Sequence, residues 1–278
     1  MLGAHVRYTQ ARGGLKRSIQ DAETMGFNVF QVFIKTNLRW MTREKLVEGD
    51  IIRFQDRKNI RKISVHSIYL TNLASDDETI RRKSINSLIN EIEIMGKMGM
   101  DPKEDFIVVH MGYNDSVTEG LHILTKSLNE VLEKTEGFCI LLENSAGQRR
   151  SIGSKLEHLI EVKEKVSERN RLFFCLDTAH LFASGYDINP DTLENIKETL
   201  GSENIKLIHL NDSKSGLNSK KDLHEFLGKG KIGYQKLQMF IEEFKKKPFV
   251  LETPISNLER LEEYREDLNF VRGILKQN

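Results

Sequence analysis

The chain has 278 residues, of which 42 are Lys or Arg and 41 are Asp or Glu, so its formal charge is +1 with neutral histidines. This length suits one α/β barrel, which needs roughly 250 residues. The apolar fraction of 38% and the small net charge exclude a chain that is mainly disordered. On first reading, a near-neutral charge also argues against a nucleic-acid-binding protein, because such proteins are usually strongly basic.

Membrane and secretory segments are not expected. No stretch approaches the roughly 18 consecutive apolar residues that a membrane span needs, and the N-terminal residues lack the basic and apolar regions of a secretory signal. The two cysteines, Cys139 and Cys175, lie in apolar runs without a C-x-x-C pair. They predict buried thiols in a reducing compartment. We therefore expect a cytoplasmic protein without a membrane partner, with a nuclear or viral setting left open.

Eight short apolar runs alternate with longer, charged, helix-period stretches. Continuous rather than alternating apolar runs are typical of strands buried on both faces, as in parallel sheets. Two of the intervening stretches, 76–98 and 156–166, have the apolar spacing of amphipathic helices. Because no linker interrupts this pattern, we predict a single (β/α)8 TIM barrel domain over residues 1–278. The predicted strands are 2–6, 29–34, 63–65, 106–109, 138–142, 172–176, 205–208 and 249–251.

Six of these runs are followed at once by a side chain that can bind a metal ion. In a parallel barrel, the C-terminal ends of the strands open on one face, where barrel enzymes build their active sites. A single such residue is more often structural, but six at the same edge indicate one shared site. The six residues are His66, His110, Glu143, Asp177, His209 and Glu252.

Three more candidate ligands lie close in sequence to this edge. His180 follows Asp177 by three residues, and Asp222 and His224 are two apart, which places both on one side of an extended backbone. His5 has either a supporting role beneath the site or a purely structural one.

Nine nitrogen and carboxylate ligands are too many for one tetrahedral ion and about right for three. Such ligands without sulfur favour catalytic zinc, with manganese or iron as competitors. A cluster of several metal ions is typical of enzymes that split phosphodiester bonds.

Seven ordered segments extend over nearly the whole chain. They are GAHV at 3–6, HSIYLTNL at 66–73, LENSAGQ at 142–148, CLDTAH at 175–180, HLNDSK at 209–214, the stretch from Asp222 to Gly233, and LETP at 251–254. Together they resemble the endonuclease IV family of zinc-dependent apurinic/apyrimidinic endonucleases. Because the resemblance runs over nearly the whole chain, we consider it specific.

This resemblance implies a (β/α)8 barrel with three zinc ions, acting as a monomer on double-stranded DNA that contains abasic sites. The implied reaction is hydrolysis of the phosphodiester 5′ to the abasic site, leaving a 3′-hydroxyl and a 5′-deoxyribose phosphate. Glu143 would bridge two ions and be the central catalytic residue. The implied ligand sets are His66, His110 and Glu143 for the first ion, Glu143, Asp177, His209 and Glu252 for the second, and His180, Asp222 and His224 for the third.

The resemblance also implies contacts to the DNA duplex, which such enzymes bend while flipping out the abasic nucleotide. Tyr69 and Leu70 match the segment that penetrates the duplex, and Asn72 and Gln148 are expected to touch it. Packing of these loops against the barrel is the alternative interpretation of all four residues.

The sequence departs from the family pattern in the loops. Leu38 stands where the family usually carries a stack-inserting arginine two residues before its tryptophan, and Arg39 is the candidate replacement. Leu223 and Met111 stand in place of a common arginine and proline. We expect these changes to alter affinity or lesion preference rather than the reaction.

Two other functions remain as alternatives. A sugar isomerase or epimerase uses a similar barrel and metal ligands, but needs fewer ions and gives the pair Asp222 and His224 no clear role. A DNA-binding protein without catalysis is disfavoured because all nine ligand types are intact. Three divalent ions would raise the formal charge of the whole protein from +1 to +7, with the added charge at the catalytic face. This removes the charge-based argument against DNA binding.

Overall fold

The computed structural model describes residues 1–36, 40 and 45–276. Its centre is an eight-stranded parallel sheet in the order β1-β10-β7-β6-β5-β4-β3-β2. All eight predicted apolar runs form strands of this sheet. The strands are β1 (Leu2–Ala4), β2 (Val29–Val32), β3 (Lys62–His66), β4 (Phe106–His110), β5 (Cys139–Glu143), β6 (Leu172–Asp177), β7 (Ile205–His209) and β10 (Phe249–Leu251).

The sheet closes on itself into a barrel. β1 pairs with β10 on one side, and on the other side a parallel bridge joins His5 to Gln31 just beyond β1. The backbone N–H of Val6 donates to the carbonyl of Gln31 at 2.8 Å and continues this seam. The predicted TIM barrel is therefore confirmed.

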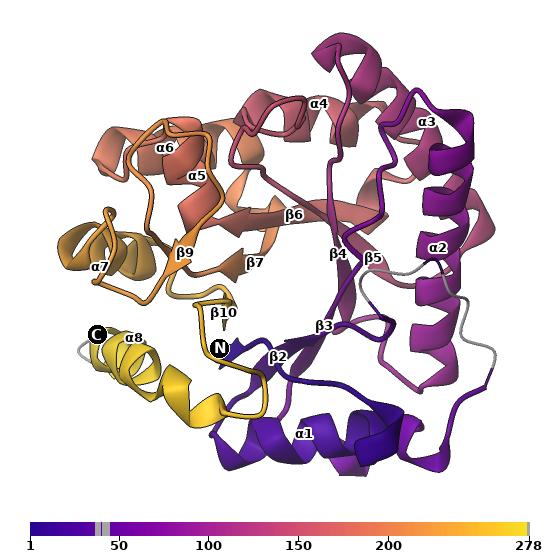
Figure 1. The fold of residues 1–278 in the computed structure, drawn as a ribbon, viewed down its shortest axis with the longest axis vertical. Helices are drawn as coiled ribbons and strands as arrows, with labels where there is room; N and C mark the ends of the chain where they lie inside the picture. Colours follow the sequence, from indigo (N-terminus) through magenta and orange to yellow (C-terminus); the bar gives the residue numbers. More distant parts are fainter. Residues whose placement is uncertain (37–39, 41–44, 277–278) are drawn as a thin grey trace.

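Helices surround the barrel, as Figure 1 shows. The predicted helices over 76–98 and 156–166 are both present, and the Asp77 carboxylate caps the first by accepting from the N–H groups of Thr79 and Ile80. Between β2 and β3, where an ideal barrel has an α-helix, the described residues form only two short 3-10 helices, at Glu48–Asp50 and Phe54–Arg57. None of the described helices is long and apolar enough to span a membrane. The α-helices are α1 (Gly14–Thr24), α2 (Glu78–Lys97), α3 (Val117–Lys134), α4 (Leu156–Lys165), α5 (Thr178–Ser184), α6 (Pro190–Leu200), α7 (Tyr234–Glu243) and α8 (Arg265–Lys276).

In β2, β4, β5, β6, β7 and β10, alternate residues belong to two separate apolar cores. In β5, Ile140 and Leu142 join the large core between strands and helices, whereas Leu141 joins a small core inside the barrel. Because side chains alternate along a strand, the next inward position after Leu141 is Glu143. The interior therefore changes from apolar to polar toward the C-terminal ends of the strands.

A short antiparallel hairpin lies outside the barrel sheet, in the region that the sequence analysis left without structure. It pairs β8 (Asp212–Ser213) with β9 (His224–Glu225). The buried Asp212 carboxylate accepts from the N–H groups of Gly228, Gly230 and Ile232 at 2.9 to 3.0 Å. These bonds fix the loop that follows the hairpin, so the position of His224 is set by the hairpin and its anchored loop.

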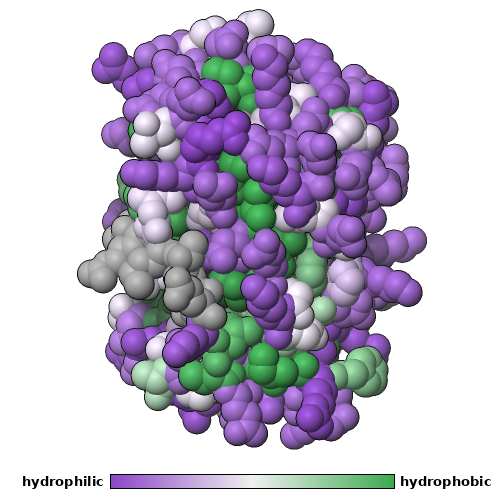
Figure 2. All heavy atoms as spheres, turned by 90° about the vertical axis from the view of Figure 1, so that its right-hand side faces the viewer, coloured by the Kyte–Doolittle hydropathy of each residue, from purple (hydrophilic) through white to green (hydrophobic). Residues whose placement is uncertain are grey.

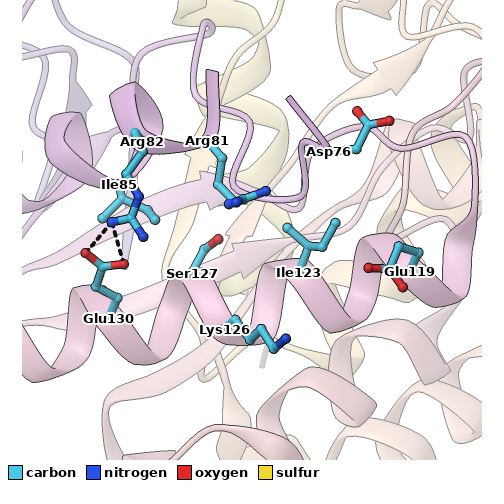
Figure 3. Close-up of a pocket in the computed structure, with 9 residues that line it drawn as sticks. All are labelled: Asp76, Arg81, Arg82, Ile85, Glu119, Ile123, Lys126, Ser127 and Glu130. Carbon is cyan, nitrogen blue, oxygen red and sulfur yellow. Dashed lines mark hydrogen bonds and ion pairs between the residues drawn. The ribbon is translucent and has the colours of Figure 1, made fainter. Parts of the chain in front are cut away.

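The outer surface over α2 and α3 is mostly hydrophilic, with apolar side chains visible between the helices (Figure 2). A groove of about 430 Å³ lies there, with Ile85 and Ile123 in its lining (Figure 3). The guanidinium of Arg82 bonds both oxygens of Glu130 across it, at 2.6 and 2.7 Å. One pair of its charged side chains is thus neutralised across the groove, and no histidine is among the described residues that line it.

Candidate metal centre

The predicted ligands meet at one end of the barrel. Five of them are the last residues of consecutive strands, β3 to β7, and the sixth directly follows β10. All six lie at the same edge of a parallel barrel, as expected from the sequence. These residues are His66, His110, Glu143, Asp177, His209 and Glu252.

The ligand atoms form three overlapping groups, and within each group they lie within 4.8 Å of one another. Glu143 belongs to two groups, and Asp177 also belongs to two. Asp222 lies beside the third group, with its Oδ1 atom 3.1 Å from Nε2 of His180 and 3.2 Å from Nε2 of His224. The groups are His66, His110 and Glu143; Glu143, Asp177, His209 and Glu252; and Asp177, His180 and His224.

Glu143 is the centre of the arrangement. Its Oε2 atom lies 3.2 Å from Nε2 of His66 and 3.1 Å from Nε2 of His110. Its Oε1 atom lies 2.9 Å from Nδ1 of His209 and 3.5 Å from Nδ1 of His180. Each oxygen of this buried carboxylate thus faces a different pair of imidazoles, which is the geometry of a bridging ligand.

The spacing of Asp177 and His180 follows from how α5 begins. Asp177 is the N-cap of this helix, and its Oδ1 atom accepts from the N–H of His180 at 2.9 Å. Aspartate is a favoured N-cap because its carboxylate satisfies a free N–H of the first turn. The same bond holds His180 in the first turn, beside the strand end that carries Asp177.

Within the described part of the chain, two buried imidazole nitrogens lack hydrogen-bond partners. They are the Nε2 atoms of His180 and His224, although the Asp222 carboxylate is close to both. The short distances without hydrogen-bond geometry show that these atoms converge on a common point rather than on one another. Orphaned buried nitrogens next to carboxylates fit a metal ion, which would satisfy all of them at once.

The electrostatics of the site favour a bound cation. Burial alone would lower the pKa of His180, but the carboxylates of Asp177 and Asp222 raise it well above its usual value. Burial likewise opposes the charge of His224, yet the same two carboxylates raise its pKa to about 9. Conversely, His209 and His110 outweigh the burial of Glu143 and hold its pKa well below its usual value. The carboxylates therefore stabilise positive charge in the site, whether it is carried by protonated imidazoles or by metal ions.

Two buried asparagines that the sequence analysis missed hold the ligands in place. The Asn144 side chain bonds the backbone N–H and carbonyl of Asp177, at 2.7 and 3.2 Å. Asn211 donates to Oδ2 of Asp177 at 2.7 Å and accepts from the N–H of Glu252 at 2.9 Å. Their positions directly after or two residues after a ligand are the signal that could have identified them. A third missed residue, Gln31, is a lone polar residue in an apolar strand.

Among the predicted DNA-contacting residues that the structure describes, Tyr69, Leu70 and Gln148 lie at the rim of this site, and the side chain of Asn72 does not. Tyr69 is 54% exposed, with its ring 6.2 Å from that of His110, and Leu70 beside it is half-buried. Gln148 lines a small crevice together with His110 and His180. Arg39 and Leu38 lie outside the described residues.

The side-chain amide of Asn72 is hydrogen-bonded to the backbone. Its Oδ1 atom accepts from the N–H groups of Ala74 and Tyr113, and its Nδ2 atom donates to the carbonyl of Tyr113 at 3.0 Å. A Cβ atom at Gly112 would lie 2.3 Å from Oδ1 of Asn72, so this approach requires glycine. Asn72 therefore fixes the loop after β4 and brings Tyr113, which is 40% exposed, to the rim.

His5 lies beneath the site, as one of its two interpretations proposed. Its Nδ1 atom is 3.9 Å from Oε1 of Glu252, and its ring centroid is 4.7 Å from that of Phe33. The rings of Phe33 and Tyr69 are 5.1 Å apart. His5, Phe33 and Tyr69 thus form one wall of an adjoining cavity of about 330 Å³, which His224 and Glu252 also line.

Comparison with known proteins places the chain in a family. A family model described as a xylose isomerase-like TIM barrel matches residues 19–274. The probable endonuclease 4 of Thermotoga sp. (strain RQ2) is 36% identical over 290 aligned positions, covering 99% of this chain and 97% of the relative.

Solved structures agree with this match. Endonuclease IV from Thermus thermophilus superposes with a TM-score of 0.85 at 28% identity, covering 100% of this chain and 99% of that chain. A D-tagatose 3-epimerase-like protein superposes with a TM-score of 0.69 at 20% identity, covering 98% of both chains, and shares the fold alone. The chain belongs to the endonuclease IV family, also called AP endonuclease family 2.

Proposed function

We propose that the protein is a metal-dependent endonuclease that hydrolyses the phosphodiester 5′ to an abasic site in double-stranded DNA. The products would be a 3′-hydroxyl and a 5′-deoxyribose phosphate. The observation that supports this proposal is the set of three overlapping groups of residues that could each hold a metal ion, found in a chain whose relatives are probable endonucleases. Clusters of this kind are suited to phosphodiester hydrolysis.

The proposed ligands are the nine residues predicted from the sequence. His66 and His110 would hold one ion with Glu143, and Glu143 would bridge to a second ion held also by Asp177, His209 and Glu252. Asp222, His180 and His224 would hold the third ion. The Asp177 carboxylate is a further ligand candidate there, because its Oδ2 atom lies 3.6 Å from Nε2 of His224. Zinc is the proposed metal because imidazole and carboxylate donors in open catalytic sites favour it, with manganese or iron as a substitute at one position.

Bound there, the ions would activate water and neutralise the charge that develops on the phosphodiester. The chain itself contributes preorganised positions. Glu143 holds two pairs of imidazoles at fixed distances, and Asn144 and Asn211 fix Asp177 from two sides. At the rim, Tyr69 is exposed beside His110, where a ring could stack on an unpaired base or sugar. Tyr69, Leu70, Gln148 and Arg39 remain the proposed DNA contacts, and Asn72 acts through Tyr113.

The third group supports a nuclease over a sugar isomerase or epimerase. Asp222 and His224 come from the hairpin region outside the barrel sheet, yet they converge on His180. Such an added group has no clear task in an enzyme that needs one ion. The barrel alone does not distinguish the two functions, because epimerase-like proteins share it.

A duplex with one tetrahydrofuran abasic analogue tests the proposal. Incubated with zinc-replete protein, it should be cut 5′ to the analogue and yield a 3′-hydroxyl that a DNA polymerase can extend. The analogue lacks the aldehyde needed for β-elimination, so a lyase cannot give this product. The undamaged duplex is the control, and absence of cleavage at the analogue would refute the proposal. Metal analysis should find close to three ions per chain, whereas one ion would favour the isomerase.

A further inference from the structure

Gln31 is a polar residue in the middle of β2, where its neighbours Phe30 and Val32 are fully buried in the apolar core. Gln31 itself has no exposed surface. Alternation along the strand turns it into the barrel, beneath the candidate metal centre. A buried amide that is not hydrogen-bonded costs folding free energy, so its partners indicate its task.

The amide of Gln31 joins two candidate ligands. Its Oε1 atom accepts from Nε2 of His209 at 2.9 Å and from the Ser64 hydroxyl at 3.1 Å. Its Nε2 atom donates to Oε1 of Glu252 at 2.6 Å. His5 lies farther away, with its Nδ1 atom 3.4 Å from the amide nitrogen.

These bonds determine which atoms are left to face the centre. A glutamine carbonyl only accepts, so Nε2 of His209 must carry a proton, and Nδ1 is the nitrogen that can bind a metal. Nδ1 indeed lies 2.9 Å from Oε1 of Glu143 and 3.3 Å from Oε2 of Glu252. On Glu252, the bond to Gln31 engages Oε1 and leaves Oε2 toward His209.

Glutamine suits this position because it offers an acceptor and a donor on one rigid amide. Glutamate offers only acceptors when ionised, methionine and leucine have no comparable donor, and asparagine is shorter by one methylene. Histidine ligands of metals commonly donate their other N–H to a neighbouring group, which fixes the ring and the tautomer.

We propose that Gln31 is a positioning residue that fixes the Nε2–H tautomer of His209 and the orientation of Glu252, so that one side chain prepares two ligands. This inference rests on the metal centre of the proposed function. Gln31 touches neither the proposed ions nor the DNA, and acts only through the two ligands.

The test compares Gln31→Met, which keeps the length and volume of the side chain, with Ser64→Ala as a matched control. Ser64→Ala removes the other donor to the Gln31 carbonyl and leaves the bonds to His209 and Glu252 in place. We expect Gln31→Met to release zinc to a chelator about 10- to 100-fold faster than the wild type. Ser64→Ala should differ from the wild type by less than about threefold on the same scale.

The second readout is the tautomer. Long-range ¹H–¹⁵N spectra of the zinc-loaded wild type should show His209 protonated at Nε2 and metal-bound through Nδ1. In Gln31→Met, this signal should shift or split. Wild-type His209 protonated at Nδ1 overturns the proposal, and this measurement needs no variant. Wild-type zinc retention in a folded Gln31→Met, or in Gln31→Leu if the first variant does not fold, also overturns it.

The two proposals fail separately. A wild type that binds zinc through Nδ1 of His209 but does not cut the abasic duplex would refute the proposed reaction and leave the role of Gln31 standing. If the wild type cuts the duplex and Gln31→Met retains zinc as well as the wild type does, the proposed role of Gln31 is refuted and the proposed reaction stands.

Discussion

The same strands line two halves of the barrel interior that differ in polarity. The lower half lies toward the N-terminal ends of the strands and is apolar, and the upper half lies at their C-terminal ends and holds the candidate ligands. In the lower half, β4, β5 and β7 contribute Val108, Leu141 and Leu207, which form a small apolar core. Two residues further on, the same strands contribute His110, Glu143 and His209. The lower half gains stability from removing apolar area from water, whereas the upper half buries charge that only neighbouring charges or ions offset.

The difference shows that apolar packing and the candidate metal ligands are separated by two residues along β4, β5 and β7. Leu141 and Glu143 are both buried, but Leu141 could be exchanged for another apolar residue of similar volume. Under the proposed function Glu143 has no such freedom, because each of its oxygens faces a separate pair of imidazoles. The next experiments perturb one half at a time.

Glu143→Gln should have the largest effect, and it acts on the upper half. An amide cannot bridge two cations, so we expect turnover on the abasic duplex to fall at least roughly a thousandfold while the barrel stays folded. Cleavage assays and circular dichroism measure these two effects. Glu133→Gln, an exposed site on α3, is the control and should retain activity. A Glu143→Gln protein with near wild-type turnover would remove the bridging role.

Leu141→Ala perturbs the lower half of the same strand. Deleting a fully buried leucine side chain leaves a cavity, which should lower the free energy of unfolding by about 2–5 kcal/mol. Urea denaturation measures the loss. Because the ligands lie above this layer, the number of bound ions should stay the same. Loss of metal from a folded Leu141→Ala would show that the two halves are not independent.

Glu91 shows the behaviour of a buried carboxylate outside the metal centre. It lies on α2, and burial raises its pKa from 4.5 to about 7, against the opposing charge of Lys35. The folded protein therefore retains a proton that the unfolded chain releases. Between pH 4.5 and about 7 this group should lower the free energy of unfolding by about 3 kcal/mol as the pH rises, with no further change above that range.

Glu91→Gln removes the titrating group, so this pH-dependent loss of stability should be absent from the variant and should appear as a pH-dependent difference between the variant and the wild type. Urea denaturation at several pH values measures it. Glu93→Gln, an exposed substitution on the same helix, should keep the wild-type slope. Identical slopes for Glu91→Gln and wild type would contradict the raised pKa.

The sequence predicted the barrel because buried parallel strands are continuous apolar runs, a pattern that is visible even in short segments such as 249–251. It predicted that six candidate ligands meet because strand ends in a parallel barrel share one face, whereas the division into three groups came from the family resemblance. The sharing of Asp177 between two groups was not predictable, because it depends on distances between loops. The hairpin that carries His224 was also missed, because its two-residue strands leave no periodic signal.

The role of Asn72 shows another limit. Its place in a family segment suggested contact with DNA, but its amide is used by the backbone around Tyr113. Sequence pattern identifies which residue types are needed at a position, and not which partner they bind. Gln31 was detectable in principle, because one polar residue interrupts an otherwise apolar strand.

The two bonds at the start of α5 restrict how the chain length can vary. Asp177 caps the helix through the N–H of His180, and both side chains also belong to one ligand group. Thr178, between them, donates its hydroxyl to the carbonyl of Asn211 at 2.6 Å. One residue inserted or deleted between Asp177 and His180 would break the cap and separate the ligands together.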